Sequence, residues 1–110
     1  RRVAAMASQK IFLYAEFQTS IPFQEIDWMP VNAAMKQRPG LMSKTWLSGV
    51  SNHSVGGFYE FDSLENARKY IDDMLLPFGR KIGATLSVRL FDGDVTRDAS
   101  RGMASPFYVK

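Results

Sequence analysis

The sequence has no cysteine, a single histidine and no long hydrophobic run. The absence of cysteine excludes disulfide scaffolds, cysteine-based zinc sites, iron–sulfur clusters and thiol nucleophiles. A zinc site or a Ser-His-Asp relay would depend on His53 alone, so we expect no metal centre and no such relay. No apolar stretch approaches the roughly 20 residues that a membrane-spanning helix needs. We therefore expect a soluble, cytoplasmic protein with no membrane partner.

Several familiar enzyme motifs are also missing, namely a P-loop, a G-x-G-x-x-G after a strand and a G-x-S-x-G elbow. The 110 residues leave room for one domain, and the 45% of apolar residues suffice for a core. Arg1 and Arg2 supply two charges of the net charge of +3, so the remainder is nearly neutral. We expect a disordered or cloning-derived extension at residues 1–9, a domain at residues 10–94 and a tail at residues 95–110.

Four strands are predicted where apolar and polar side chains alternate. These segments are Lys10–Gln18, Leu41–Ser48, Val55–Phe61 and Leu86–Phe91. Turn-forming residues at positions 49–54 indicate that the second and third strands form a hairpin. The tail after Asp94 shows no steady period, so it should be ordered only if it docks on the domain.

Two helices are predicted from apolar residues at helical spacing. The first starts near Phe23, with a kink caused by Pro30 and regular turns beginning near Asp27, whose carboxylate would cap them. The second starts at Asp62 and Ser63, with Glu65 completing a capping box. Its apolar stripe comprises Leu64, Ala67, Ile71, Met74, Leu75 and Phe78, and Pro77 and Gly79 are expected to end it.

The order strand, helix, strand, strand, helix, strand predicts an α+β fold of the ferredoxin-like βαββαβ type. Right-handed crossovers would place both helices on one face of a four-stranded antiparallel sheet. We expect the other face to be bare and to carry Phe12, Tyr14, Trp46 and Phe91. These side chains are too large and apolar to be left in water, so a second copy of the chain, an RNA strand or a ligand should cover them.

The predicted hairpin carries the residues that are most suited to catalysis or ligand binding. An imidazole has an ordinary pKa near 6.5, so His53 can transfer a proton at neutral pH. Trp46 can stack on a flat substrate and donate one hydrogen bond. Gly56 and Gly57 allow a backbone or a ligand to approach closely. Each residue also has a plain structural interpretation, as a core indole, a loop histidine and a glycine bulge.

The chain resembles the YdhR-like mono-oxygenases, which belong to the dimeric α/β-barrel group with the antibiotic-biosynthesis mono-oxygenases. The residues that carry this resemblance are Pro39-Gly40-Leu41, Lys44, Trp46, Asn52-His53, Gly56-Gly57, Tyr59, Phe61, Ala67, Tyr70 and Phe91-Asp92. It covers roughly residues 10–94 and leaves the tail out. It implies a ferredoxin-like monomer whose sheet packs against the sheet of a second copy, forming a homodimer.

The resemblance implies an oxidoreductase, because related enzymes oxidise aromatic polyketides with molecular oxygen and without metal or flavin. They use an Asn, a Trp and an Arg, types that Asn52, Trp46 and Arg89 supply here. We therefore expect a mono-oxygenase without a cofactor, acting on a small phenolic or quinonoid substrate. In this hypothesis Trp46 and Tyr59 stack on the ring beside Gly56 and Gly57. His53 transfers the proton, Asn52 orients the substrate and Arg89 stabilises negative charge.

Two other functions use the same strand order. An RNA-recognition module would explain the aromatic run Phe58-Tyr59-Glu60-Phe61, but Glu16 and Glu60 would place carboxylates near the phosphates. We therefore expect no nucleic-acid partner. The remaining alternative is a non-catalytic dimeric protein that binds a small ligand or acts in a stress response, and the sequence does not separate it from the enzyme.

Overall fold

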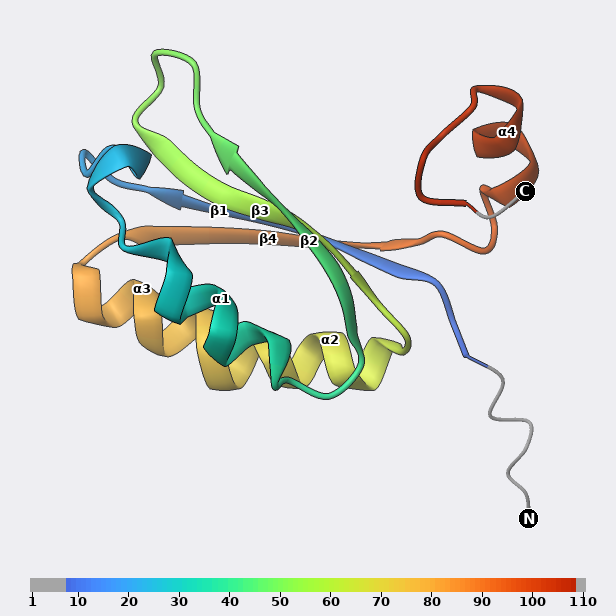
Figure 1. Cartoon of the computed structure of the whole chain (residues 1–110), viewed down its shortest axis with the longest axis horizontal. Helices are drawn as coiled ribbons and strands as arrows, with labels where there is room; N and C mark the ends of the chain where they lie inside the picture. Colours follow the sequence, from blue (N-terminus) through green and yellow to red (C-terminus); the bar gives the residue numbers. More distant parts are fainter. Residues whose placement is uncertain (1–7, 109–110) are drawn as a thin grey trace.

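The computed structural model describes residues 8–108 of the chain (Figure 1). In order, its elements are β1 (Ile11–Gln18), η2 (Phe23–Glu25), α1 (Trp28–Lys36), β2 (Leu41–Ser48), β3 (Ser54–Phe61), α2 (Leu64–Tyr70), η3 (Ile71–Leu75), α3 (Leu76–Ile82), β4 (Thr85–Asp92) and α4 (Arg97–Gly102). The strands form one four-stranded sheet in the order β2-β3-β1-β4. All pairings are antiparallel. The predicted α+β class is confirmed, and the strand order is compatible with the ferredoxin-like fold.

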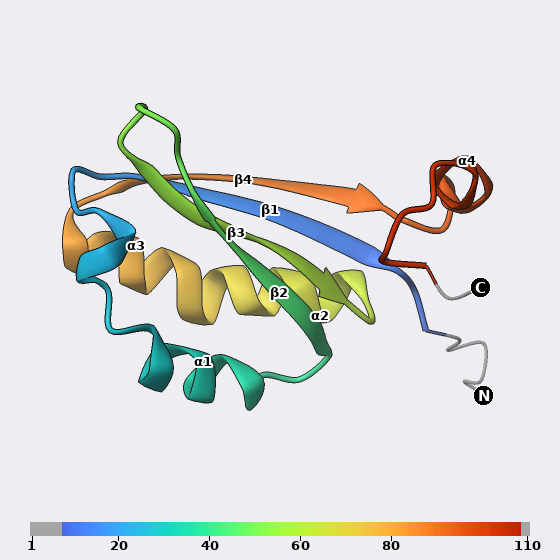
Figure 2. The ribbon, with the colours of Figure 1, turned by 45° about the horizontal axis from the view of Figure 1, so that its top comes forward.

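The helices cover one face of the sheet. Figure 2 shows α1 and the long helix formed by α2, η3 and α3 on the same side of the four strands. The central strand β1 turns Ile11, Leu13, Ala15 and Phe17 into the core beneath them, with Leu13 and Ala15 completely buried. This alternation is the one that the sequence predicts. No helix within residues 8–108 is long and apolar enough to cross a bilayer.

A bulge in β2 changes which of its side chains face the core. The register shifts between Leu41, which pairs with Phe61, and Ser43, which pairs with Glu60. An extra residue in one strand reverses the faces of the residues that follow it. As a result Leu41 and Trp46 both pack against the core, although they are an odd number of residues apart. The predicted position of Trp46 on the bare face is therefore wrong.

The first helical segment is broken into two parts. A short turn, η2, precedes α1, and Asp27 occupies the N-cap position of α1 without a side-chain hydrogen bond. The predicted start of regular turns near Asp27 is confirmed, but the predicted carboxylate cap is wrong. The chain is interrupted at the extended residue Ile26, before α1, and the kink expected at Pro30 is wrong as well. Pro30 lies in the first turn of α1, where the amide hydrogen that proline lacks has no partner within the helix.

The second helix starts where the sequence predicts and ends later. Ser63 is its N-cap, and its Oγ accepts a hydrogen bond from the Asn66 amide at 3.0 Å. Asp62 instead accepts from the Asn66 side chain at 2.9 Å, so the predicted Asp62–Glu65 capping box is wrong. The cap is the neighbouring serine.

Pro77 and Gly79 do not end this helix, contrary to the prediction. The π-helical turn η3 precedes Pro77, and the Leu76 amide donates to the carbonyl of Ile71, five residues earlier. A wider turn accommodates a proline at the start of α3 without breaking the helix. Gly79 is buried, and a Cβ there would lie 3.2 Å from Cε1 of Phe17, so this helix packs closely on the sheet. The helix ends at Gly83, which has a φ of 67°.

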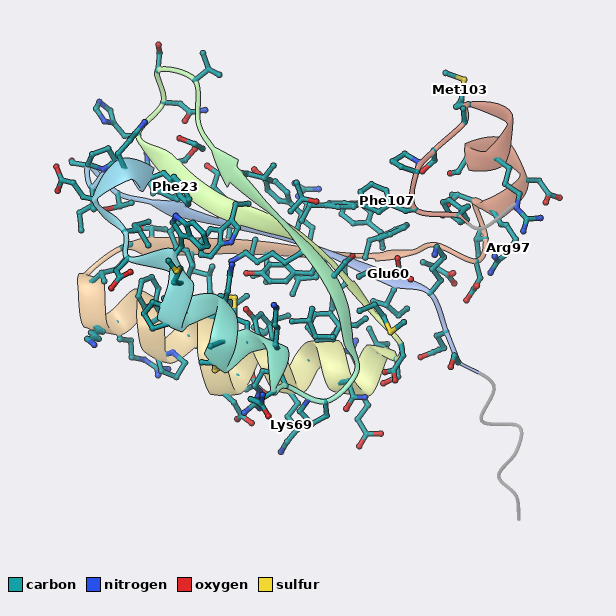
Figure 3. The ribbon with its side chains drawn as sticks, viewed as in Figure 1. Phe23, Glu60, Lys69, Arg97, Met103 and Phe107 are labelled. Atoms are coloured by element: carbon teal, nitrogen blue, oxygen red, sulfur yellow. The ribbon has the colours of Figure 1, made fainter. Side chains whose placement is uncertain are left out.

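The segment after β4 folds back on the open face of the sheet. Figure 1 shows α4 beyond the end of β4, and in Figure 3 Phe107 lies on the side of this segment that faces the sheet. The ring centroids of Phe12 and Phe107 are 5.8 Å apart, and the Tyr108 hydroxyl donates to the Gly93 carbonyl at 2.8 Å. Phe12 also stacks on Phe58 at 5.1 Å. The chain itself therefore covers part of the face that was expected to be bare.

The expected N-terminal extension lies mainly outside the described residues, which begin at residue 8. Gln9 is tied to the start of the second helix. Its amide donates to the Asp62 carbonyl at 2.8 Å, and its side-chain oxygen accepts from the Leu64 amide at 2.8 Å.

Candidate functional site

A cavity of about 370 Å³ lies between the sheet and the helices. Its walls come from β1, α1, β2, β3 and the η3–α3 part of the long helix. The lining residues are Phe17, Thr19, Ile21, Ile26, Pro30, Val31, Ala34, Met35, Lys44, Trp46, Val55, Gly56, Tyr59, Met74, Leu75, Phe78 and Ile82. Most of these side chains are apolar. A mainly apolar cavity of this size, with few polar groups, is typical of a small-molecule site.

Among residues 8–108, Lys44 is the one lining residue with a cationic side chain. It follows the bulge in β2, so its side chain shares the core-facing side with Trp46. Its Nζ lies 3.2 Å from the centre of the Trp46 ring, 4.9 Å from the centre of the Tyr59 ring and 3.5 Å from Sδ of Met35. No carboxylate among residues 8–108 forms an ion pair with it. Burial away from water lowers the pKa of Lys44 to about 7.

The glycine pair of β3 makes room for this lysine and for the neighbouring strand. A Cβ at Gly57 would lie 2.6 Å from Cε of Lys44 and 3.0 Å from Cε1 of Tyr59. A Cβ at Gly56 would lie 2.0 Å from the carbonyl oxygen of Ala15 on β1. Any side chain at position 57 would therefore displace the stem of Lys44, and any at position 56 would force β1 and β3 apart.

Trp46 is held in place by the N-terminal helical segments. Its indole nitrogen donates to Oδ1 of Asn32 on α1 at 2.9 Å. The ring of Phe23, which is labelled in Figure 3, lies with its centroid 5.5 Å from that of Trp46. The indole N–H is therefore used within the protein, where the sequence had suggested a hydrogen bond to a substrate. What the cavity receives from Trp46 is its apolar ring surface.

Tyr59 and Tyr70 form a buried pair at the inner end of the site. The Tyr70 hydroxyl donates to the Tyr59 hydroxyl at 3.3 Å, and their ring centroids are 5.1 Å apart. Burial raises the pKa of Tyr70 to about 12. Burial, together with the Tyr70 phenol, raises the pKa of Tyr59 still further. Both phenols are therefore neutral at physiological pH, and neither acts as an anionic partner for Lys44.

The structure brings only some of the predicted site residues together. Trp46, Tyr59 and Gly56 line the cavity, and Gly57 adjoins it through the stem of Lys44. Asn52 and His53 lie exposed at the tip of the β2–β3 hairpin, where Oδ1 of Asn52 accepts from Oγ of Ser54 at 2.6 Å. Neither residue lines the cavity.

Arg89 lies away from the cavity as well. It is exposed on β4 and pairs with Tyr14 across the sheet, between Val88 and the core-packed Leu90. Because side chains alternate along a strand, Arg89 faces the open side of the sheet. The catalytic roles expected of Asn52, His53 and Arg89 stay predictions.

Lys44 is the functional candidate that the sequence did not single out. Its spacing to Trp46 shows that the two residues share a face, but the face itself depends on the bulge before Ser43. An alternating pattern without that bulge assigns both side chains to the open face. Asn32 and Met35, which complete the site from α1, have no sequence signal of their own.

No three His, Asp or Glu side chains in the described part of the chain lie close enough together to hold a metal ion. A comparison with family models matches residues 12–101 to the family described as "Putative mono-oxygenase ydhR". The match extends from β1 into α4, so it includes part of the tail that the resemblance had left out. No curated protein matches the chain.

Proposed function

Because the chain belongs to the YdhR family of mono-oxygenases, we propose that the cavity beneath the sheet binds a small aromatic molecule and is the place where it is oxidised. The observation that carries this proposal is the cavity itself. It offers apolar walls, the rings of Trp46 and Tyr59 and the amine of Lys44. A flat aromatic molecule buries its faces against such walls and loses little conformational freedom on binding.

The proposed reaction needs molecular oxygen and no metal or flavin. In an anthrone-type substrate, loss of a proton gives an anion that donates electrons to oxygen. The reacting methylene loses two hydrogens and gains one oxygen atom, and the second oxygen atom leaves as water. The protein's task is to bind the ring, help its ionisation and stabilise the anion.

We also propose a homodimer that forms through the open face of the sheet. Phe91 is 47% exposed on this face, and Arg89 and Tyr14 also lie on it. A second copy would cover the apolar side chains that the tail leaves in water. Sedimentation at micromolar concentration tests this proposal. A dimer is expected, and a well-folded single protomer would contradict it.

The oxidation is tested by incubating the pure protein with an anthrone-type phenol under air and measuring oxygen consumption and the quinone formed. Trp46→Phe should slow the reaction several-fold, because the ring surface shrinks and the bond to Asn32 is lost. Unchanged turnover in this variant would contradict the cavity as the reaction site.

The same assay tests the residues outside the cavity. Asn52→Ala, His53→Ala and Arg89→Ala should lower turnover only if those side chains have the roles expected of them. Unchanged turnover removes the role of the residue concerned. Binding of the aromatic molecule without any oxygen consumption would instead identify a non-catalytic ligand-binding protein.

A further inference from the structure

The surroundings of Lys44 raise a question that the proposed reaction does not answer. A partly buried amine lies among apolar side chains, and no carboxylate within residues 8–108 pairs with it. Structural lysines usually extend their ammonium group into water or pair it with a carboxylate. Lys44 instead places its Nζ over two aromatic rings. Lys44 therefore has no counter-ion among the described residues, and an anionic ligand can supply one.

We propose that Lys44 exchanges a proton with an acidic phenol or enol bound in the cavity and holds the resulting anion as an ion pair. This inference rests on the function proposed above, and it assigns to Lys44 the two tasks expected earlier of His53 and Arg89. It also defines the ligand as an aromatic compound with an ionisable hydroxyl group next to an apolar ring system.

The energetics of a charge in this cavity favour an anionic ligand. An ammonium group that loses its water without gaining a partner is strongly destabilised. An anion placed beside it offsets this cost, and the attraction between the two charges is stronger in the apolar cavity than in water. The Trp46 ring, 3.2 Å from Nζ, adds a favourable interaction with the ammonium form. A neutral aromatic compound of the same shape gains none of these contributions.

The proton transfer balances without any further reactant. The phenol O–H bond breaks, the proton forms a third N–H bond on the neutral amine, and no electrons change hands. With a pKa of about 7, a large fraction of Lys44 is unprotonated at neutral pH and can accept this proton. Oxidation of the anion is a separate, later event.

The neighbouring groups leave Lys44 as the residue that titrates near neutral pH. From β3 it faces Tyr59, behind which lies Tyr70 of α2, and both phenols are neutral in this range. Arg38, whose charge acts on Tyr70, is paired with Asp73 at 2.9 Å. The remaining neighbours on α1, β1 and η3–α3 are uncharged, namely Asn32, Met35, Phe17, Met74, Leu75 and Phe78.

The test uses 4-nitrophenol under nitrogen, so that binding is measured without turnover. Its phenolate absorbs visible light, and absorbance therefore reports the ionisation of the bound molecule. We expect the apparent pKa of the bound phenol to fall by about one unit or more in the wild-type protein and in Lys44→Arg. In Lys44→Met it should rise above the free value, because only the apolar cavity remains.

Proton uptake separates proton exchange from simple attraction of an anion. At about pH 8 Lys44 is mostly neutral, so binding of the phenolate should draw nearly one proton per ligand from a weakly buffered solution. Lys44→Arg is already charged and should bind the phenolate without proton uptake. An indicator dye measures this uptake. Absence of uptake in the wild-type protein would overturn the proposal.

Lys69→Met is the matched control, because it removes the same charge from an exposed site on the outer side of the helices (Figure 3). It should bind and ionise 4-nitrophenol as the wild-type protein does. Equal phenolate affinity in Lys44→Met and Lys69→Met would overturn the proposal. Ionisation and proton uptake without oxygen consumption under air would refute the oxidation and leave the role of Lys44 intact. Normal oxidation in Lys44→Met would instead refute the role of Lys44 and leave the proposed oxidation intact.

Discussion

Replacing Gly57 with alanine should release Lys44 from the cavity with little effect on the fold. The new Cβ would lie 2.6 Å from Cε of Lys44, where ordinary contacts begin at 3.4 Å. The nearest obstacle is the far end of a flexible side chain, so the lysine stem can move away while the strand stays in place. The buried Tyr59 ring, 3.0 Å from the new Cβ, must also shift by a few tenths of an ångström. We therefore expect the free energy of unfolding to fall by about 1–2 kcal/mol.

The expected result is a rise in the pKa of Lys44. Its amine has an ordinary pKa of 10.5, and burial lowers it to about 7. Moving Nζ toward water removes part of this burial, and each unit of recovered pKa corresponds to about 1.4 kcal/mol. We expect a rise of about one unit or more, accompanied by weaker binding of 4-nitrophenolate.

An NMR titration of the lysine ε-methylene resonances measures this pKa, with Lys44→Met identifying the signal. Gly102→Ala is the control, because a Cβ at Gly102 would have no atom within 4 Å. It should leave the pKa of Lys44 unchanged. A pKa that stays at about 7 in Gly57→Ala would refute the view that this glycine holds Lys44 in the cavity.

Four further predictions concern pH, the site and the fold. Lys44 has a pKa of about 7 in the folded protein and an ordinary pKa of 10.5, so between these pH values the unfolded chain binds more protons than the folded one. Chemical denaturation should therefore show stability rising with pH in this window. Lys44→Met should abolish the rise. Above about pH 10 stability should fall again, because the raised pKa of Tyr70, about 12, keeps a proton that the unfolded chain has lost. Asn32→Ala should weaken 4-nitrophenol binding several-fold by freeing the Trp46 ring, as a fluorescence titration would show; unaltered affinity would speak against its positioning role. Ser63→Ala should cost about 1 kcal/mol by removing the N-cap of α2, whereas a loss as large for Asp62→Ala would contradict the assignment of the cap.

The strands were predictable because their alternation is strong and local. Ile11, Leu13, Ala15 and Phe17 face the core as the sequence indicates, and the bounds of β2 are the predicted ones. The face of Trp46 was not predictable. It depends on a bulge whose only trace in the sequence is that Leu41 and Trp46 are both apolar and an odd number of residues apart.

The end of the long helix could not be predicted from local signals either. Pro77 and Gly79 usually end a helix, but here a π turn accommodates the proline, and close packing on Phe17 explains the glycine. Neither feature follows from the residue types alone, because one is a change in the hydrogen bonding of the helix and the other is a contact with the sheet. The candidate site follows the same rule, because Trp46 and Tyr59 attract attention by type, whereas Lys44 matters only through its burial.

The most direct test of the account is a crystal structure of the protein with 4-nitrophenol bound. The ligand should lie in the cavity between the sheet and α1, with its ring beside Trp46 and its oxygen within hydrogen-bond distance of Nζ of Lys44. A ligand bound on the open face of the sheet, or in the cavity with its oxygen turned away from Lys44, would contradict it.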